Sequence, residues 1–392
     1  MAAYACAANG HEVTLFEKNE KLGKKIYITG KGRCNLTNDC SPEDFLMNVV
    51  RGRKFLTGAA YSFPASRTIR FMEENGLAVK VERGNRVFPV SDHASDVTKT
   101  LEHACVKAGV EIRLKETAVK LLTEEGRICG ILTDHGRYDC DAVIVATGGL
   151  SYPSTGSTGD GYRFAKETGH TIVPPLPSLV GLELRENYSN AQGISLKNVV
   201  LSAKRGEKVI SSRMGEALFT HYGISGPLIL TLSAEINRIP LTEISLALDL
   251  KPALTEKELN ARFIRDFSER KNEQLKSVMR GFLPAKLIPY VLSVAEANGE
   301  VRANSVTKET RAKLIRALKE FPLTPKALRG FSEAVITSGG IELSEVNPKT
   351  MASKKTEGLS FCGEVLDLDA YTGGYNLQIA FSTGYIAGNT IK

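Results

Sequence analysis

The stretch that decides the fold is FCGEVLDLDAYTGGYNLQIAFSTGYIAG, residues 361–388. An apolar strand over 359–362 ends in a Gly-Glu pair, and a Gly-Gly-Tyr-Asn turn then opens a helix of small residues from about Leu377. Glycines let a large ligand approach the backbone, and the first turn of a helix offers unpaired N–H groups to an anion or an electron-rich ring oxygen. The pattern predicts the flavin-binding end of a dinucleotide fold, in which Glu364 holds the ribityl chain.

The first 17 residues predict a matching unit at the other end of the chain. A helix of small residues closed by Gly10 precedes a strand over 12–16, and Glu17 stands where a Rossmann unit binds the adenosine ribose hydroxyls. The first strand of such a unit and its GxGxxG phosphate loop are missing before the helix. We therefore expect a start upstream of Met1, because a sheet without its central strand would expose edges and apolar area.

Two further glycine-rich segments lie in the first half of the chain. Residues 22–38, LGKKIYITGKGRCNLTN, suit a loop around phosphates and a ring edge, although a solvent loop with turn asparagines is the alternative. Residues 141–149, DAVIVATGG, indicate a buried parallel strand whose end lets the backbone pass close to a dinucleotide. A helix is expected to begin near Asp160, which suits either an N-cap or a ligand contact.

The pattern changes after Gly181 and returns near Ala334. Residues 182–250 alternate like short strands, and 256–319 are helical, with Thr255 and Thr307 as N-cap candidates. A strand over 334–337 then leads back to the tail.

Composition limits the classes of function. The chain has 392 residues, of which 42% are hydrophobic, and no run approaches the ~18 apolar residues of a membrane span. Seven cysteines without Cys-x-x-Cys or paired Cys/His spacing predict neither a metal nor disulfides, and they suit the cytoplasm. The net charge of +7 is modest and is spread over residues 18–31, 251–280 and 302–326, with no basic patch interleaved with aromatics. We therefore expect no membrane or nucleic-acid partner.

Four motifs together resemble the bacterial FAD-binding flavoproteins loosely called HI0933-like, a family that includes aminoacetone oxidases and bile-acid reductases. They are TGKGRCNLTN at 29–38, ATGGLSYPSTGSTGDG at 146–161, GEVLD with GGYN at 363–376, and FTHYGISGP at 219–227. The resemblance runs nearly end to end. It implies an α/β fold in which residues 1–180 and 331–392 form a split Rossmann-like FAD domain of the two-dinucleotide type. Residues 181–330 would form an inserted substrate domain, β-barrel-like over 181–250 and helical over 251–325.

The site residues expected from the motifs and the resemblance fall into two groups. Those expected to contact FAD are Glu17, Lys25, Gly32, Arg33, Asn35, Val119, Thr147, Gly148, Gly149, Asp160, Glu364, Asp367, Gly373, Gly374, Tyr375 and Asn376. His221 and Tyr222, in the insert, are the leading candidates to polarise a substrate carbonyl and donate a proton. Tyr152 and Tyr375 are the second choice for these roles. A purely structural role for each of these side chains is the alternative.

Three functions remain open. The first is reduction, with NAD(P)H as donor, of a C=C bond conjugated to a ketone in a small apolar substrate, a 3-oxo-4-ene or 4,6-diene steroid acid of the bile-acid kind. The second is oxidation of an amine or aminoketone by oxygen, and the third is binding or modification of RNA by a flavin-bearing protein. A broad apolar cavity favours the first, a carboxylate or aromatic cage the second, and a contiguous Lys/Arg face with steep salt dependence the third.

Overall fold

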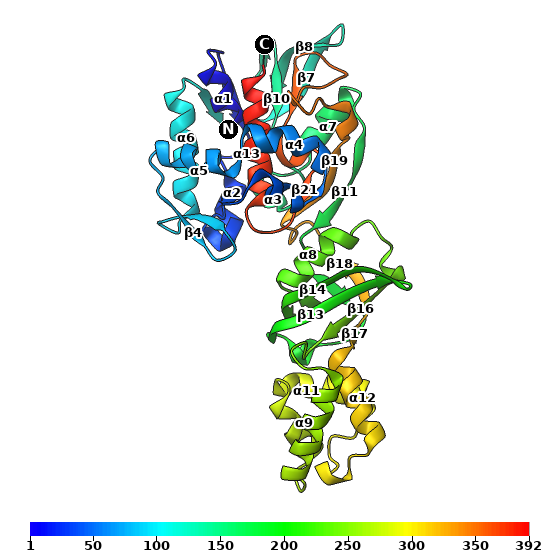
Figure 1. The fold of residues 1–392 in the computed structure, drawn as a ribbon. Helices are drawn as coiled ribbons and strands as arrows, with labels where there is room; N and C mark the ends of the chain where they lie inside the picture. Colours follow the sequence, from blue (N-terminus) through cyan, green and yellow to red (C-terminus); the bar gives the residue numbers. More distant parts are fainter. Residues whose placement is uncertain (392) are drawn as a thin grey trace. The chain divides into compact units, whose positions relative to one another are not determined.

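The computed structural model describes residues 1–391, and the chain divides into two compact units. Unit 1 consists of Met1–Ser178 and Gly330–Lys392, and unit 2 consists of Leu179–Arg329. The two ends of the chain, blue and red in Figure 1, lie together in unit 1. Among the described residues no helix combines the length and apolar character needed to cross a bilayer, and no cluster of three or more His, Cys, Asp or Glu suits a metal ion.

Unit 1 contains two short parallel pairs of strands. β1 (Thr14–Glu17) pairs with β6 (Glu111–Leu114), and β10 (Val143–Val145) pairs with β20 (Leu359–Phe361). The second pair joins strands more than 200 residues apart, so the first half of the chain and the tail share one core. Val145 and Phe361 are buried there, as expected for a parallel strand with apolar residues along its length.

Smaller sheets and helices surround these strands. The remaining strands of unit 1 are β2 (Thr37–Asn38), β3 (Val49–Arg51), β4 (Val79–Glu82), β5 (Arg86–Pro89), β7 (Ala118–Glu124), β8 (Arg127–Thr133), β9 (Arg137–Asp139), β11 (Ile172–Ser178), β19 (Ile336–Ile341) and β21 (Asp369–Ala370). Its helices are α1 (Ala2–Ala8), α2 (Lys24–Ile28), α3 (Pro42–Met47), α4 (Arg53–Ser62), α5 (Ala65–Glu74), α6 (Ala94–Lys107), α7 (Asp160–Glu167) and α13 (Tyr375–Asn389).

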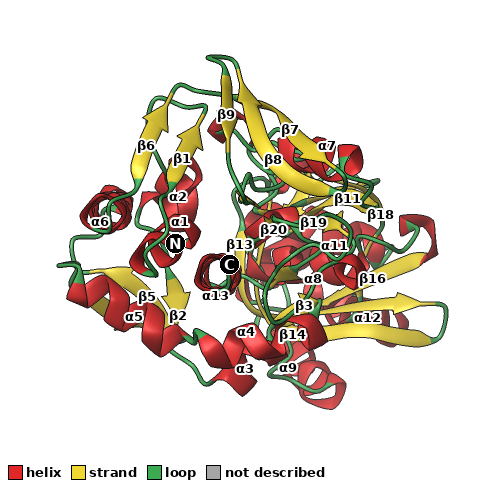
Figure 2. Cartoon of the chain, turned by 90° about the horizontal axis from the view of Figure 1, so that it is seen from above, coloured by secondary structure: helices red, strands yellow, loops and turns green. Residues whose placement is uncertain are grey.

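The small residues of the two terminal helices let α1 and α13 approach closely. A Cβ atom on Gly388 would lie 2.1 Å from the Ala2 carbonyl oxygen, and one on Gly384 would lie 3.4 Å from the Ala2 nitrogen. Figure 2 shows the two helices side by side, with β1 and β6 next to each other. The predicted small-residue helices at 1–10 and from 377 therefore pack against one another inside unit 1.

Unit 2 is built on one seven-stranded antiparallel sheet, in the order β17-β16-β13-β14-β15-β12-β18. The strands are β12 (Leu182–Leu184), β13 (Ser195–Arg205), β14 (Lys208–Phe219), β15 (Gly223–Ser225), β16 (Ile244–Asp249), β17 (Phe321–Leu323) and β18 (Pro325–Leu328). Its edge strands β17 and β18 do not pair with each other among the described residues. The expected barrel-like sheet is therefore not a closed barrel.

The helices of unit 2 pack onto this sheet. They are α8 (Pro227–Ile236), α9 (Glu256–Glu269), α10 (Leu275–Val278), α11 (Ile288–Val294) and α12 (Lys308–Lys319). Thr255 accepts a hydrogen bond from the Glu258 backbone N–H in a capping box, and Thr307 accepts one from the Thr310 backbone N–H at the start of α12. Both predicted N-caps are therefore confirmed.

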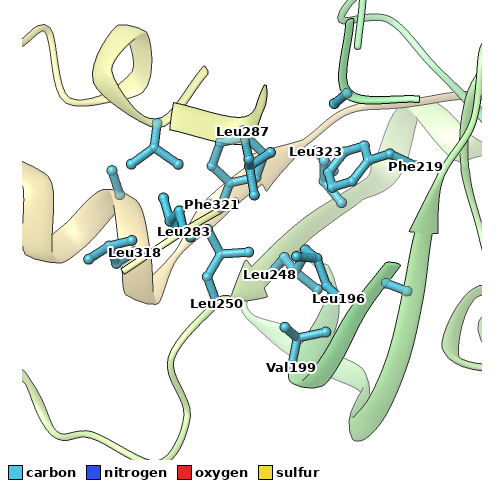
Figure 3. Close-up of a cluster of buried hydrophobic side chains, with 14 of the residues drawn as sticks. Leu196, Val199, Phe219, Leu248, Leu250, Leu283, Leu287, Leu318, Phe321 and Leu323 are labelled. Carbon is cyan, nitrogen blue, oxygen red and sulfur yellow. The ribbon is translucent and has the colours of Figure 1, made fainter. Parts of the chain in front are cut away.

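One hydrophobic core joins the helices of unit 2 to its sheet. Figure 3 shows Leu283, Leu287 and Leu318 from the helical part packed among side chains of the sheet such as Leu248 and Phe321. All five are at most 5% exposed. The helical part is consequently fixed to the sheet, since separating them would expose this apolar area to water.

Candidate functional site

The carboxylate of Glu364 lies at the end of β20, where four segments of unit 1 meet. Its side chain is only 11% exposed. One carboxylate oxygen accepts hydrogen bonds from the Thr337 backbone N–H at 2.9 Å and from Ser151 Oγ at 2.5 Å, and the other binds the Lys25 ammonium group. The structure therefore brings together Glu364 and Lys25, two of the residues expected to contact FAD.

Ser151 and Thr337 complete this cluster, although neither was among the expected site residues. Thr337 Oγ1 accepts hydrogen bonds from the backbone N–H groups of Leu150 at 2.8 Å and Ser151 at 3.1 Å. A Cβ atom on Gly149 would lie 2.5 Å from Thr337 Oγ1 and 3.0 Å from Glu364 Oε1. Gly149 is thus required for the strand end to approach the carboxylate. The sequence signal shared by the two missed residues is that each lies two positions from a Gly-Gly pair.

A second polar cluster fastens the loop after β10 to the end of β1. Glu17 Oε1 accepts hydrogen bonds from the backbone and side-chain nitrogens of Asn19 at 2.8 and 2.7 Å, and Asn19 Nδ2 also donates to the Thr155 carbonyl at 3.1 Å. Lys18 Nζ lies 2.6 Å from Asp160 Oδ2. The strand-end acid Glu17 and Asp160 are therefore held close to the same loop.

Asp160 begins α7 but does not cap it. Gly159 is the N-cap residue, and the Asp160 carboxylate instead accepts hydrogen bonds from Lys18 and Thr158. Burial raises the pKa of Asp160, but these hydrogen bonds and the nearby positive charges outweigh burial and place the pKa below its ordinary value. The carboxylate is therefore ionised at neutral pH, and its charge is already paired with Lys18.

The Gly-Gly turn of the tail begins α13 and lies against β2. Gly374 has φ of 97°, and a Cβ atom there would lie 2.4 Å from the carbonyl carbon and oxygen of Thr37. Asn38 Nδ2 donates to the Gly373 carbonyl at 3.1 Å. The helix begins at Tyr375, two residues earlier than expected, so its unpaired first-turn N–H groups lie directly after this turn.

Asn376 uses both ends of its amide to hold that turn. Its Oδ1 accepts from the Ala370 N–H at 2.9 Å, and its Nδ2 donates to the Ala370 carbonyl at 2.8 Å. We expect Asn376→Ala to lower the free energy of unfolding by about 1–3 kcal/mol, because it leaves buried backbone groups unpaired. Denaturant unfolding measures this loss, and an unchanged midpoint and slope would contradict the positioning role.

Three buried polar atoms near these clusters have no hydrogen-bond partner among residues 1–391: Asn35 Oδ1, Thr147 Oγ1 and the Tyr162 hydroxyl. Burial raises the pKa of Tyr162, and the carboxylates of Glu364 and Asp367 raise it further. A Cβ atom on Gly161 would lie 2.3 Å from Thr147 Oγ1. Because more than nine in ten buried polar groups are paired in native proteins, these atoms call for a partner, which a water or a polar ligand would supply. The residues present thus fit a dinucleotide cofactor.

The other expected contact residues lie elsewhere in unit 1. Arg33 is bound by Glu82 and Asp92 and lies over the Phe88 ring at 4.2 Å, and it is not among the contacts of Glu364. Gly32 beside it is exposed.

Four of the expected residues contact other residues of unit 1. Val119 lies on β7, with its carbonyl accepting from Arg163 at 2.5 Å and its side chain 42% exposed. A Cβ atom on Gly148 would lie 3.1 Å from Ser157 Oγ. The Asp367 N–H donates to the Ile341 carbonyl, and the Tyr375 ring lies 6.3 Å from Phe45.

His221 and Tyr222 form the tight turn between β14 and β15 in unit 2. His221 is exposed, and the two rings meet edge to face with their centroids 5.0 Å apart. A Cβ atom on Gly181 would lie 2.6 Å from the Tyr222 hydroxyl, and the Arg329 guanidinium lies over the Tyr222 ring at 4.5 Å. Tyr222 therefore packs against the segments by which the chain enters and leaves unit 2.

Comparisons with known proteins agree with this architecture. The chain is 33% identical, over 99% of its length and 95% of the other protein, to the 3-dehydro-bile acid delta(4,6)-reductase of Clostridium scindens. It is 32% identical, over all of its length and 96% of the other protein, to the ribosomal RNA dihydrouridine synthase of Haemophilus influenzae.

A solved structure shows the same fold. This is the 3-ketosteroid-delta4-(5alpha)-dehydrogenase of Rhodococcus jostii RHA1, with a TM-score of 0.50 and 15% identity over 99% of this chain and 92% of that one. The model of the HI0933-like protein Rossmann domain matches residues 1–390. The expected resemblance is thereby confirmed, and the chain belongs to the HI0933-like family of Rossmann-domain oxidoreductases.

Proposed function

We propose that unit 1 binds FAD and that the protein uses it to reduce a C=C bond conjugated to a carbonyl group. The observation that carries the proposal is the cluster around Glu364 at the ends of the parallel strands β10 and β20, with unpartnered buried polar atoms in the same unit. Ligands of open α/β sheets bind at the carboxyl ends of the strands. A bound FAD supplies a two-electron carrier between a nicotinamide and the substrate.

The roles of the residues follow from their positions. We assign Glu364, oriented by Ser151 and Thr337, to the ribityl hydroxyls, and Glu17 to the hydroxyls of the adenosine ribose. The first turn of α13 after Gly374 would bind the electron-rich oxygen of the pyrimidine end of the ring. The ammonium group of Lys25 pairs with Glu364, so it neutralises a carboxylate that would otherwise repel a phosphate.

The proposed reaction adds two hydrogen atoms across the double bond. NAD(P)H gives up a hydride and becomes NAD(P)⁺, the hydride reaches the β-carbon, and a proton is added to the α-carbon. A donor group on the protein polarises the carbonyl, so that negative charge can develop on its oxygen. The names of both curated relatives describe a reduction of this kind, one in a bile acid and one in a uracil ring, where C5=C6 is conjugated to a carbonyl.

Two substrates fit this chemistry. The first is a 3-oxo-4-ene or 4,6-diene steroid acid, supported by the 33% identity to the bile acid reductase. The second is a uridine of ribosomal RNA, supported by the 32% identity to the dihydrouridine synthase and by a concentration of positive charge in unit 2. This second candidate differs from the expectation of no nucleic-acid partner, which the product analysis below tests.

Product analysis tests the proposal. The FAD-loaded protein is incubated without oxygen with NADH or NADPH and either a 3-oxo-4-ene steroid acid or an unmodified ribosomal RNA transcript. We expect mass spectrometry to find one of the two substrates heavier by two hydrogen atoms, and no product when FAD is omitted. Consumption of amines with oxygen, with neither substrate reduced, would contradict the proposal and favour an oxidase.

The turn of His221 and Tyr222 is the proposed source of the proton. A positioned donor contributes about 10²- to 10⁴-fold in rate. His221→Ala or Tyr222→Phe should slow single-turnover reoxidation of the reduced protein by its substrate by a factor in that range. Flavin content should stay unchanged, because the group acts on the substrate. Wild-type rates in both variants would remove the two residues from the mechanism.

A further inference from the structure

The positive charge of the chain is concentrated in one part of unit 2, residues 251–329, which we call the basic segment. It holds 17 Lys and Arg against 9 Asp and Glu, a net charge of +8, whereas the whole chain carries +7. Residues 179–250 of the same unit hold seven of each sign, and unit 1 holds 27 Lys and Arg against 28 Asp and Glu. The positive charge is therefore concentrated in this part of unit 2 and is not spread evenly along the protein.

Acidic neighbours do not neutralise the basic segment. Lys276 pairs with Glu300 at 2.6 Å and Arg270 with Glu273 at 2.6 Å, so several of its acids are already engaged. Exposed cations for which the described part of the chain provides no ion pair are Lys257 in α9, Lys308 and Arg316 in α12, and Lys271, Arg280, Lys286 and Arg302 in the connecting segments. A solvated helix face usually alternates charges of opposite sign, so this surplus calls for an anionic partner.

Backbone pairing brings cations from separate segments together. The Asn304 N–H donates to the Lys271 carbonyl at 3.3 Å, and Gln274 pairs with Arg302, so Lys271 and Arg302 lie on adjoining segments. Elsewhere, Arg262 Nη2 donates to the Gly281 carbonyl at 2.8 Å, next to Arg280.

The half-buried side chain of Lys251 carries a further positive charge close to Arg262. Burial lowers the pKa of Lys251, and the positive charge of Arg262 lowers it further. Cations thus crowd one another at two places in the segment.

The basic segment is also rigidly mounted. Leu283, Leu287 and Leu318 fix it to the sheet of unit 2 through the core in Figure 3. A surface that is already ordered loses little conformational entropy when a partner binds. The arrangement suits a large, rigid polyanion.

We propose that the basic segment is a docking surface for RNA, so that the substrate of the reductase is a uridine held within ribosomal RNA. The proposal rests on the reaction given above. Lys and Arg that neutralise phosphates supply most of the sequence-independent affinity for nucleic acid. A steroid acid carries a single negative charge, which one cation satisfies, so it does not explain a surplus of eight.

An anionic membrane is the other extended partner to consider. Membrane-surface helices present a broad apolar face with Trp, Phe or Leu beside their cations. Among the large hydrophobic side chains of the basic segment only Ile264 and Val294 are exposed, at 49% and 39%, and they lie on different helices. RNA therefore fits this surface better than a bilayer does.

Filter binding of an unmodified ribosomal RNA transcript to the flavin-loaded protein tests the surface. The test variant carries four substitutions, Lys271→Gln, Arg280→Gln, Lys286→Gln and Arg302→Gln. Two double variants, Lys271→Gln/Arg302→Gln and Arg280→Gln/Lys286→Gln, separate the contributions of the two places. The matched control is Lys204→Gln/Lys208→Gln in the exposed β13–β14 hairpin, because it removes charge from the neutral part of the same unit. Thermal unfolding verifies that each variant is folded.

Each cation that contacts a phosphate contributes about 0.7–0.9 to the slope of log K against log salt, so the fourfold variant should flatten the slope by up to about 3. We expect its Kd at 0.1 M salt to rise at least about tenfold, with each pair giving part of the effect and the hairpin control giving little. Reduction of a steroid acid, where it occurs, should not change.

Three results would overturn the proposal. One is wild-type affinity and slope in the fourfold variant, and another is equal losses in the hairpin control. The third is no RNA binding by the wild-type protein, and charge-dependent binding to phosphatidylserine vesicles in that case would identify a membrane as the partner. Failure of the reductase reaction itself is distinguishable, since it leaves the binding data intact while no substrate gains hydrogen.

Discussion

Replacing Glu364 by alanine should yield a folded protein that purifies with little flavin. The carboxylate is nearly buried and takes hydrogen bonds from the Thr337 N–H and Ser151 Oγ, as well as the Lys25 ammonium. Its loss removes the proposed ribityl acceptor and leaves these donors pointing at an empty position. A hydrogen bond to a charged group contributes about 1.5–3 kcal/mol, which corresponds to about 10- to 100-fold weaker flavin binding.

The measurement is the ratio of visible to ultraviolet absorbance after purification, followed by titration of the apoprotein with FAD. Glu345→Ala is a matched control, because Glu345 also pairs with a lysine, Lys355, but otherwise contacts Thr171. Burial raises the pKa of Glu345, while the hydrogen bonds from Lys355 and Thr171 outweigh burial and bring it to about 2. Full flavin content in Glu364→Ala would rule out the assigned role.

The lowered pKa of Glu345 also determines how its contribution to the stability of the protein depends on pH. Because the pKa of Glu345 is lowered on folding, its contribution to stability is present above the ordinary value near 4.5 and is lost as the pH falls toward 2. Glu345→Ala should therefore reduce stability at neutral pH and leave flavin affinity unchanged.

Gly374→Ala should destabilise unit 1 by about 3 kcal/mol or more. The residue has φ of 97°, where a side chain costs about 1–2 kcal/mol, and its Cβ would lie 2.4 Å from the Thr37 backbone. Overpacking against a rigid neighbour adds about 1–3 kcal/mol. Denaturant unfolding is the measurement, with flavin content as a second readout, because α13 begins at this residue.

Gly58→Ala provides a control of opposite sign. Gly58 is exposed in α4, and a Cβ there would make only an ordinary contact with the Pro348 carbonyl at 3.9 Å. Alanine in a helix interior is favoured over glycine by about 0.8–1 kcal/mol, so stability should rise slightly. Equal unfolding midpoints for Gly374→Ala and the wild type would contradict the close approach of α13 to β2.

The predictable parts of the fold were those with local signals. The strand expected over 12–16 is β1 (Thr14–Glu17), and the apolar runs around Val145 and Phe361 are the paired strands β10 and β20. Continuous Val, Ile and Ala make such strands visible in the sequence. The position of Glu364 followed from the same pattern, because an acid directly after a buried strand stands at the edge of the sheet.

Elements that depend on distant partners were not predictable. The helices α3 and α4 are separated by β3, a strand that has no local signal because it pairs with β21 more than 300 residues away. Gly52 marks the break, since a Cβ there would lie 2.1 Å from Leu368. Ser151 was missed for the same reason, because its partner Glu364 is 213 residues away and no local pattern identifies it.

The concentration of positive charge is hidden when the net charge is counted over the whole chain. Counted by unit, unit 2 carries a net charge of +8 and unit 1 one of −1, and within unit 2 the surplus lies in residues 251–329. A domain boundary was needed before the charge became informative about a partner.

The most direct test of the account is the visible spectrum of the protein under anaerobic conditions. The account predicts a flavin band that NADH or NADPH bleaches and that returns, without oxygen, on addition of a 3-oxo-4-ene steroid acid or an unmodified ribosomal RNA transcript. A protein that stays colourless after reconstitution with FAD, or a reduced flavin that only oxygen reoxidises, would contradict it.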